Sequence, residues 1–170
     1  MRPVTVQTSI AAPRDQVFDF VSDMANRVAF MDHYLKDFRL ARANSTGTGA
    51  AARYRIKGKW AGTSIVECDR PQKIVEEGSA GRFGRTKLLV VWTFQEDGGE
   101  RTRVELEART EPGARVEALG EALGARGWLQ RQSKKALERL RRIFEEPAGE
   151  APRRATVAAY ESATAPRYGA

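Results

Sequence analysis

The longest periodic pattern of apolar residues in the chain predicts a helix from about Val116 to Glu146. Its apolar positions recur every three or four residues, which is the spacing of one face of an α-helix. They are Val116, Leu119, Leu123, Leu137, Leu140, Ile143 and Phe144. At about 1.5 Å per residue such a helix would run to roughly 45 Å, so it has to lie across the whole domain and needs a second layer over its apolar stripe.

Upstream of this helix, alternating apolar and polar residues predict strands. The first runs from Val4 to Ile10, and two short helices follow it, from about Pro13 to Val21 and from Met24 to Met31. Six further strands are predicted in succession, separated by turn residues: 35–40, 52–56, 60–68, 73–78, 88–94 and 104–108. Hairpin connections make neighbouring strands antiparallel, so we expect an α+β domain with one curved sheet covered by the terminal helix.

Three glycines, Gly120, Gly124 and Gly127, recur on one side of the first half of the predicted helix. Each costs about 1 kcal/mol relative to alanine in a helix interior, so their presence needs a reason. Close packing of the helix on the sheet, a hollow left for a ligand and a later helix start near Trp128 all account for them. The sequence leaves these three explanations open.

The chain of 170 residues is the length of one domain with a substantial core. We expect that domain to comprise residues 1–146. Residues 147–170 have no hydrophobic period and are rich in alanine, glycine, proline and arginine, so a largely disordered tail is expected there. Docking of Val157, Ala158 and Tyr160 on a partner is the alternative for this tail.

Charge and motifs exclude several classes of protein. The formal net charge is +7, but no helix-turn-helix, zinc-finger or RNP pattern accompanies it, so nucleic acid is not an expected partner. Cys68 is the only cysteine, which excludes an internal disulfide and a CxxC pair. No phosphate loop, metal-ligand spacing or nucleophile elbow is present, and we expect neither a metal nor a cofactor. The longest clean apolar run, Leu88 to Trp92, is too short to span a bilayer, and a cytoplasmic location is expected.

Several short signals in fixed order carry a family resemblance across residues Val4 to Glu146. They are Ser9-Ile10-Ala11-Ala12-Pro13, Val17-Phe18, Ser22-Asp23, Gly47-Thr48-Gly49, the turn from Glu67 to Pro71, the segment from Gly99 to Val104 and the long final helix. In these features the chain resembles the START-like (SRPBCC) superfamily, closest to its polyketide cyclase/dehydrase and lipid transport branch. The resemblance implies a helix-grip fold, in which a curved antiparallel sheet wraps around the last helix and encloses a mostly apolar cavity. Many relatives carry a tryptophan with prolines where this chain has residues 30–34, which leaves the subfamily and the ligand open.

If that fold is right, inward aromatic and aliphatic side chains line the cavity. The candidates are Phe30, Tyr54, Phe83, Trp92, Phe94, Leu119, Leu123 and Trp128. For each of them, simple core filling is the competing explanation.

Two residues are weak candidates for acid-base chemistry. His33 is the only histidine, and Asp32 and Tyr34 flank it, but adjacent residues in a chain seldom face each other, so a structural role competes with a catalytic one. Tyr54 is the other candidate. Cys68, on a predicted strand, is expected to be a small buried hydrophobe rather than a nucleophile.

A basic strip, Arg53, Arg55, Lys57 and Lys59, follows one strand face. It is either a solvated surface or a contact for anionic lipid headgroups. Our first hypothesis for the function is a noncatalytic binder or carrier of a hydrophobic small molecule such as a lipid or polyketide. The second is a polyketide cyclase or dehydratase. The third is an adaptor that binds a protein or an anionic surface through its basic helix face and tail. The oligomeric state is not predicted.

Overall fold

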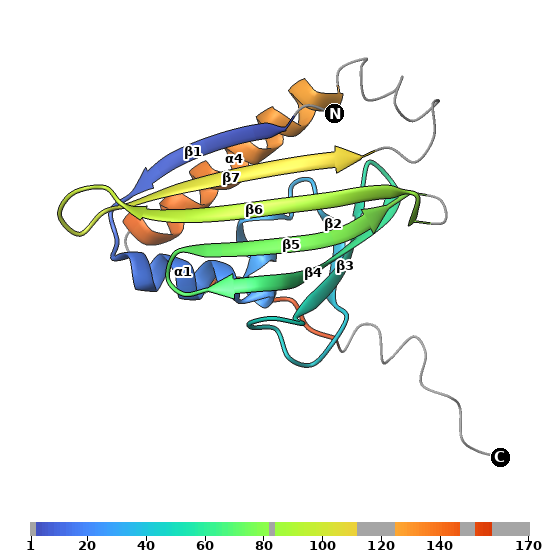
Figure 1. The fold of residues 1–170 in the computed structure, drawn as a ribbon, viewed down its shortest axis with the longest axis horizontal. Coiled ribbons are helices and arrows are strands. Elements are labelled where there is room, and N and C mark those ends of the chain that lie inside the picture. The colour runs from blue at the N-terminus through green and yellow to red at the C-terminus, as the bar shows by residue number, and fades with distance from the viewer. Residues whose placement is uncertain (1–2, 82–83, 112–124, 147–151, 158–170) are drawn as a thin grey trace.

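The structure is a computed structural model that describes residues 3–81, 84–111, 125–146 and 152–157. Within this part of the chain, seven strands form one antiparallel sheet in the order β1-β7-β6-β5-β4-β3-β2 (Figure 1). The strands are β1 Val4–Ile10, β2 Lys36–Leu40, β3 Ala51–Ile56, β4 Lys59–Asp69, β5 Lys73–Ala80, β6 Thr86–Glu96 and β7 Thr102–Glu111. The helices are α1 Arg14–Ser22, the 3₁₀ helix η1 Met24–Asn26, α2 Arg27–Met31 and α4 Arg126–Glu145.

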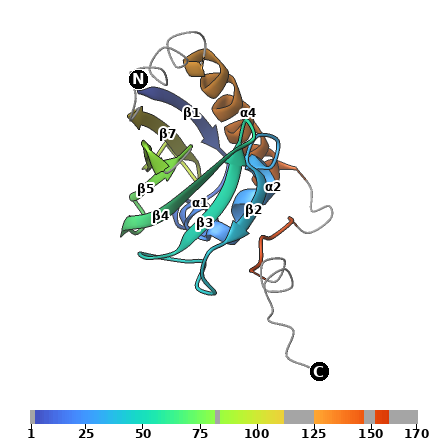
Figure 2. The same ribbon diagram turned by 90° about the vertical axis from the view of Figure 1, so that its right-hand side faces the viewer.

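The element order confirms the predicted α+β helix-grip fold. Strands β2 to β7 follow one another through hairpins, and β1 joins β7 at the far edge, with Val4 opposite Ala108 and Ile10 opposite Thr102. Helix α4 packs on β1 and α2 inside the curve of the sheet, and α1 packs on β6 (Figures 1 and 2). The first half of the predicted long helix, with Val116, Leu119, Gly120, Leu123 and Gly124, lies outside the described residues.

Local irregularities give the sheet its curvature. The pairing of β4 with β5 shifts register between Ile65 and Glu67, and β2 shifts against β3 between Lys36 and Arg39. Such bulges bend a strand and increase its twist. At Gly78 of β5 a Cβ would lie 2.0 Å from the carbonyl oxygen of Gly62, so only glycine allows β4 and β5 to approach this closely.

The two-residue turn between β3 and β4 lies close to the start of α4. Lys57 (φ 50°) and Gly58 (φ 77°) both have positive φ, which is the backbone of a type I′ turn and matches the twist of a two-residue hairpin. Ile56 and Lys59 pair across it. The ammonium nitrogen of Lys57 then lies 4.4 Å from the ring centroid of Trp128 at the start of α4.

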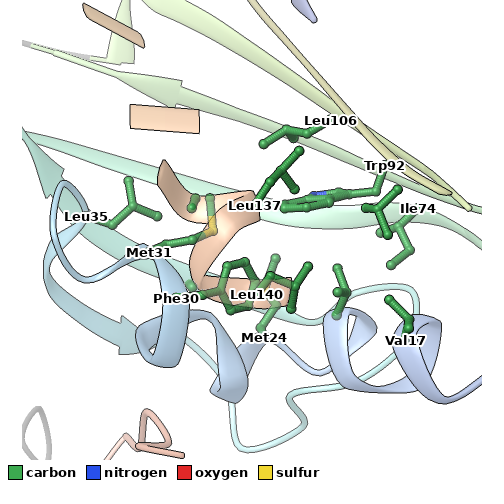
Figure 3. Close-up of a cluster of buried hydrophobic side chains, with 14 of the residues drawn as sticks. Val17, Met24, Phe30, Met31, Leu35, Ile74, Trp92, Leu106, Leu137 and Leu140 are labelled. Atoms are coloured by element: carbon green, nitrogen blue, oxygen red, sulfur yellow. The ribbon is translucent and has the colours of Figure 1, made fainter. Parts of the chain in front are cut away.

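The core lies between the concave face of the sheet and the helices. Leu137 and Leu140 of α4 are 1% and 0% exposed, as their helical spacing predicts. In Figure 3 their side chains lie among residues from β5, β6, β7 and the short helices, including Trp92 and Phe30. Burying a leucine fully stabilises the fold by about 1.5–3 kcal/mol, so α4 is a principal source of stability.

Residues 152–157, within the tail predicted to be disordered, have no helix or strand but contact the domain. The Ala155 amide donates to the carbonyl oxygen of Ala25 at 2.7 Å. Arg154 donates to the side chains of Asn26 at 2.7 Å and Asp23 at 2.6 Å. The boundary of the domain at residue 146 therefore stays a prediction, and at least this segment belongs with η1.

Candidate functional site

A partly enclosed cavity of about 90 Å³ lies between the concave face of the sheet, α2 and α4. Most of its lining is apolar and comes from all of these elements, with Met31, Leu35, Ile56, Leu88, Val90 and Leu129 among the residues. Its polar lining includes Arg27, Tyr34, Tyr54, Thr63, Glu76 and Ser133. Space of this size holds several water-sized groups.

A buried ion pair forms the centre of the polar lining. The Nη2 of Arg27 on α2 donates to the Oε1 of Glu76 on β5 at 2.5 Å, and the two side chains are only 4% and 7% exposed. Two neutral donors also reach the carboxylate: Trp92 Nε1 to Oε1 at 3.0 Å and Thr63 Oγ1 to Oε2 at 3.3 Å. Removing two charges from water costs several kcal/mol each, and such a pair is tolerable only when further hydrogen bonds support it.

The guanidinium of Arg27 is held by more than the carboxylate. Its Cζ lies 4.5 Å from the ring centroid of Trp92, which is a cation-π contact. Its Nε is buried and has no hydrogen-bond partner. A buried donor left unsatisfied costs about 1–3 kcal/mol, so this nitrogen is an unusual feature of the core.

Two tyrosines of the cavity lining are kept neutral. The Tyr54 hydroxyl donates to Thr63 Oγ1 at 3.5 Å, and its ring stacks on Phe38 with centroids 5.5 Å apart. Burial raises the pKa of Tyr34 and of Tyr54 well above the ordinary tyrosine value. Both hydroxyls therefore remain protonated near neutral pH, where they can donate hydrogen bonds but cannot act as bases.

The predicted cavity residues lie in different environments. Tyr54 is in the cavity lining. Phe30, Trp92 and Phe94 are at most 2% exposed and pack within the core, with the rings of Phe30 and Trp92 6.2 Å apart. The ring of Phe94 meets the edge of Phe18 at 5.2 Å.

Trp128 is half-buried near the start of α4, with its ring 6.1 Å from that of Tyr34. The structure therefore brings Trp128 next to a residue of the cavity lining. Phe83, Leu119 and Leu123 lie outside the described residues. A ligand contact for any residue of this predicted set stays a prediction.

His33 is held between α2 and α4 and is not among the described residues of the cavity lining. Its Nε2 lies 3.2 Å from the carbonyl oxygen of Gln132, and its Nδ1 lies 3.2 Å from Nη1 of Arg139. Burial lowers the pKa of the ring below its ordinary value, and the charge of Arg139 acts in the same direction. His33 therefore has partners that orient its ring, although its neighbours in the sequence did not indicate them. Both ring nitrogens, however, contact protein groups.

Arg27 and Glu76 are not among the site residues predicted from the sequence. A signal for both was nevertheless present, because each charge occupies an apolar position of its element. Arg27 is three residues from Met24 and from Phe30 on one helix face, and Glu76 alternates with Ile74 on the buried face of β5. A positive and a negative residue at buried positions of one domain favour a buried pair.

The basic strip divides into two parts in the structure. Lys57 reaches toward α4, whereas Arg53 and Arg55 point to the outer face of the sheet around Trp60, which is 38% exposed. The guanidinium carbons of Arg55, Arg53 and Arg39 lie 4.7, 5.4 and 5.9 Å from the centroid of the Trp60 ring. We refer to Arg39, Arg53, Arg55 and Trp60 as the Trp60 patch.

Two further features bear on the hypotheses drawn from the sequence. Cys68 is partly buried, and burial raises the pKa of its thiol, which disfavours the nucleophilic thiolate. Among the described helices, none is both long enough and apolar enough to cross a bilayer.

Comparison with known proteins decides the family. The sequence matches the family described as polyketide cyclase/dehydrase and lipid transport over residues 1–145. The chain belongs to this family. The resemblance to the START-like superfamily is thereby confirmed, and no curated protein matches the sequence.

Solved structures support the same fold for this member of the polyketide cyclase/dehydrase and lipid transport family. A START superfamily protein from Mycobacterium smegmatis is 14% identical, with a TM-score of 0.60 over 85% of this chain and 97% of that one. The hypothetical protein jhp0584 from Helicobacter pylori is 10% identical, with a TM-score of 0.71 over 85% and 88%. DynU16, a protein in the dynemicin biosynthetic locus, is 20% identical, with a TM-score of 0.61 over 86% and 48%. At these identities the likeness concerns the fold alone.

Proposed function

We propose that this protein binds a hydrophobic small molecule in the cavity between the sheet and α4, without catalysing a reaction. The observation that supports this most directly is a largely apolar cavity that retains empty space inside an otherwise packed core. Transfer of apolar surface from water into such a site is favourable by about 25 cal/mol per Å². Membership of a family associated with lipid transport agrees with this proposal.

The size of the cavity limits the ligand. A space of about 90 Å³ accepts only a few non-hydrogen atoms, so a complete lipid or polyketide does not fit without a change in the surrounding side chains. We therefore expect either a small ligand or one part of a larger molecule in this space. A larger ligand would have to extend toward the open side of the cavity.

Native mass spectrometry of the freshly purified full chain tests the proposal. We expect a complex whose extra mass is released on denaturation and can be identified. Val90→Phe should reduce occupancy because Val90 lines the cavity, whereas Val91→Phe, on the opposite face of the same strand, should leave it unchanged. Absence of any complex from the purified chain, or equal occupancy in the two variants, would contradict the proposal.

The catalytic alternative, a polyketide cyclase or dehydratase, has no specific support from the two residues considered for it. Both ring nitrogens of His33 contact protein groups, and Tyr54 is held in its protonated form. We therefore keep ligand binding as the proposed function.

We also propose that an anionic membrane surface is a partner, through the Trp60 patch. Three guanidinium groups around a partly exposed tryptophan combine positive charge with an amphipathic ring suited to the headgroup region. The basic face of α4 is a weaker candidate, because Arg139, Arg141 and Arg142 are each paired with a carboxylate. In the Trp60 patch, Arg55 is paired with Asp37 at 3.4 Å. Binding of another protein through α4 stays a prediction.

A further inference from the structure

We propose that the Trp60 patch contains a specific site for a phosphate monoester, the headgroup of phosphatidic acid, which Arg39 and Arg53 bind together. This inference rests on the proposed membrane contact, since it specifies the lipid that the patch recognises. It combines three observations: the register of these two arginines, their lack of carboxylate partners, and a surface groove that both of them line.

The first observation concerns two like charges on neighbouring strands. Arg39 of β2 and Arg53 of β3 are directly opposite each other in the register, so both side chains leave the same face of the sheet. Their guanidinium carbons lie 5.9 and 5.4 Å from the centroid of one ring, that of Trp60. Like charges directly opposite on antiparallel strands destabilise the pairing. An anion bound by both guanidinium groups would remove this repulsion.

The second observation concerns the counterions of these arginines. Arg55, the third arginine of the patch, lies 3.4 Å from a carboxylate oxygen of Asp37. Within the part of the chain that the structure describes, neither Arg39 nor Arg53 forms an ion pair or donates a side-chain hydrogen bond. Arg53 is exposed and Arg39 is half-buried, so a ligand from solution can reach them. These two guanidinium groups are therefore available to an external anion.

The third observation concerns the space beside the two arginines. A surface groove of about 330 Å³ is lined by Arg39, Arg53 and Trp60, with Leu40 and Ala41 completing its wall. A phosphate monoester has about −1.5 to −2 charges near neutral pH and three terminal oxygens that accept hydrogen bonds. Guanidinium groups bind such oxygens through paired N–H···O bonds. The groove therefore offers both the room and the donors that this group needs.

The tryptophan favours a membrane lipid as the source of the phosphate. Trp60 is 38% exposed, and tryptophan rings at a membrane surface lie at the level of the headgroups. Phosphatidic acid presents a phosphate monoester at that level, whereas the phosphate of phosphatidylserine is a diester with less charge. Two arginines without carboxylate partners therefore match phosphatidic acid better than phosphatidylserine.

Vesicles of equal surface charge test this preference on the full chain. Phosphatidylcholine vesicles contain either phosphatidic acid or phosphatidylserine, in amounts adjusted until their zeta potentials are the same. Cosedimentation should give a dissociation constant about tenfold lower for phosphatidic acid. Arg39→Lys and Arg53→Lys keep the charge but lose the guanidinium fork, so each should remove most of this preference. Arg55→Lys should keep the preference, because Arg55 belongs to the patch but does not line the groove.

The fold of each variant is checked by circular dichroism. Equal binding to the two kinds of vesicle, or an equal loss of preference in Arg53→Lys and Arg55→Lys, would overturn the site but leave the proposed membrane contact intact. Glycerol phosphate, a soluble monoester, should compete only weakly with the vesicles. If it binds as tightly as phosphatidic acid does, the lipid assignment is overturned. Binding to neither kind of vesicle would contradict the proposed membrane contact itself.

Discussion

At the scale of single residues, the contacts of His33 define its protonation state. The Gln132 carbonyl oxygen can only accept, so Nε2 carries the hydrogen, and the Arg139 guanidinium can only donate, so Nδ1 does not. Protonation of Nδ1 would place an N–H group against this cation. The neutral ring is therefore the form that the native structure stabilises.

This geometry predicts a pH dependence of stability. The folded-state pKa of His33 is lowered from an ordinary value of about 6.5, so below that pH the unfolded chain takes up the proton first. The free energy of unfolding should therefore fall as the pH decreases from about 6.5 toward the folded-state pKa. Urea titrations at pH 7.5 and 5.5 should show a larger loss for the natural chain than for His33→Gln.

The same variant separates structure from binding. His33→Gln should leave ligand affinity nearly unchanged, since His33 is not among the described residues of the lining. An NMR titration that places the pKa of His33 above 6.5 would refute this account of the ring.

Prediction of the candidate site from the sequence was partial, and particular residues show why. The alternation in β3 was enough to orient Tyr54 inward, because period two fixes the face of a strand. It could not show that Trp92 and Phe94 would be packed by neighbours rather than facing empty space, since that depends on how side chains from distant elements fill the volume. The contact of Arg27 with Glu76 joins residues 49 positions apart, so no local pattern contains it.

At the scale of elements, two glycines differ in how much space surrounds their Cα atoms. Gly78 is required by the close approach of β5 to β4, whereas a Cβ at Gly127 would meet only the end of the Arg131 side chain at 3.7 Å. Close packing on the sheet therefore does not explain Gly127, the one member of the predicted glycine stripe that the structure describes.

Alanine substitutions at these two positions should change stability in opposite directions. Gly78→Ala should lower the free energy of unfolding by about 2 kcal/mol or more, because the added methyl group overlaps the backbone of β4. Gly127→Ala should raise it by up to about 1 kcal/mol through its higher helix propensity. Urea unfolding monitored by circular dichroism measures both, and a neutral Gly78→Ala would show that the strands can separate without cost.

The pattern of apolar residues predicted the element order well because six of the seven strands are linked in succession, so local turns determine most of the topology. No local turn determines the pairing of β1 with β7. That pairing can be predicted only if all seven strands are assumed to form one sheet. The bulges in β2 and β4 had no clear sequence signal, since Asp37 has positive φ without being glycine.

At the scale of the whole molecule, the chain has a net charge of +7, and three of its arginines gather around Trp60 on the outer face of the sheet. If the Trp60 patch docks on membranes, the chain should bind vesicles that contain phosphatidylserine more tightly than vesicles of phosphatidylcholine alone. Arg53→Gln should weaken this binding about fivefold, which corresponds to about 1 kcal/mol for each basic residue near the surface. Cosedimentation with vesicles at low and high salt measures the effect.

A matched control comes from α4. Arg142 is exposed like Arg53 but pairs with Glu138 and Glu146, so Arg142→Gln should have a smaller effect. Trp60→Ala should reduce binding without changing the salt dependence, because it removes the ring and no charge. Equal binding to neutral vesicles, or equal effects of Arg53→Gln and Arg142→Gln, would argue against the patch as the docking site.

The return of residues 152–157 to η1 affects how the protein should be shortened for experiments. Asp23 caps the Ala25 amide with one carboxylate oxygen and receives Arg154 on the other, and Asn26 receives the same arginine. An expression boundary placed just after α4, where the hydrophobic pattern stops, would remove the counterion of Asp23 and expose the Ala25 carbonyl oxygen. Because η1 leads directly into α2, which holds Arg27, truncated proteins are a poor substitute for the intact chain in any affinity measurement.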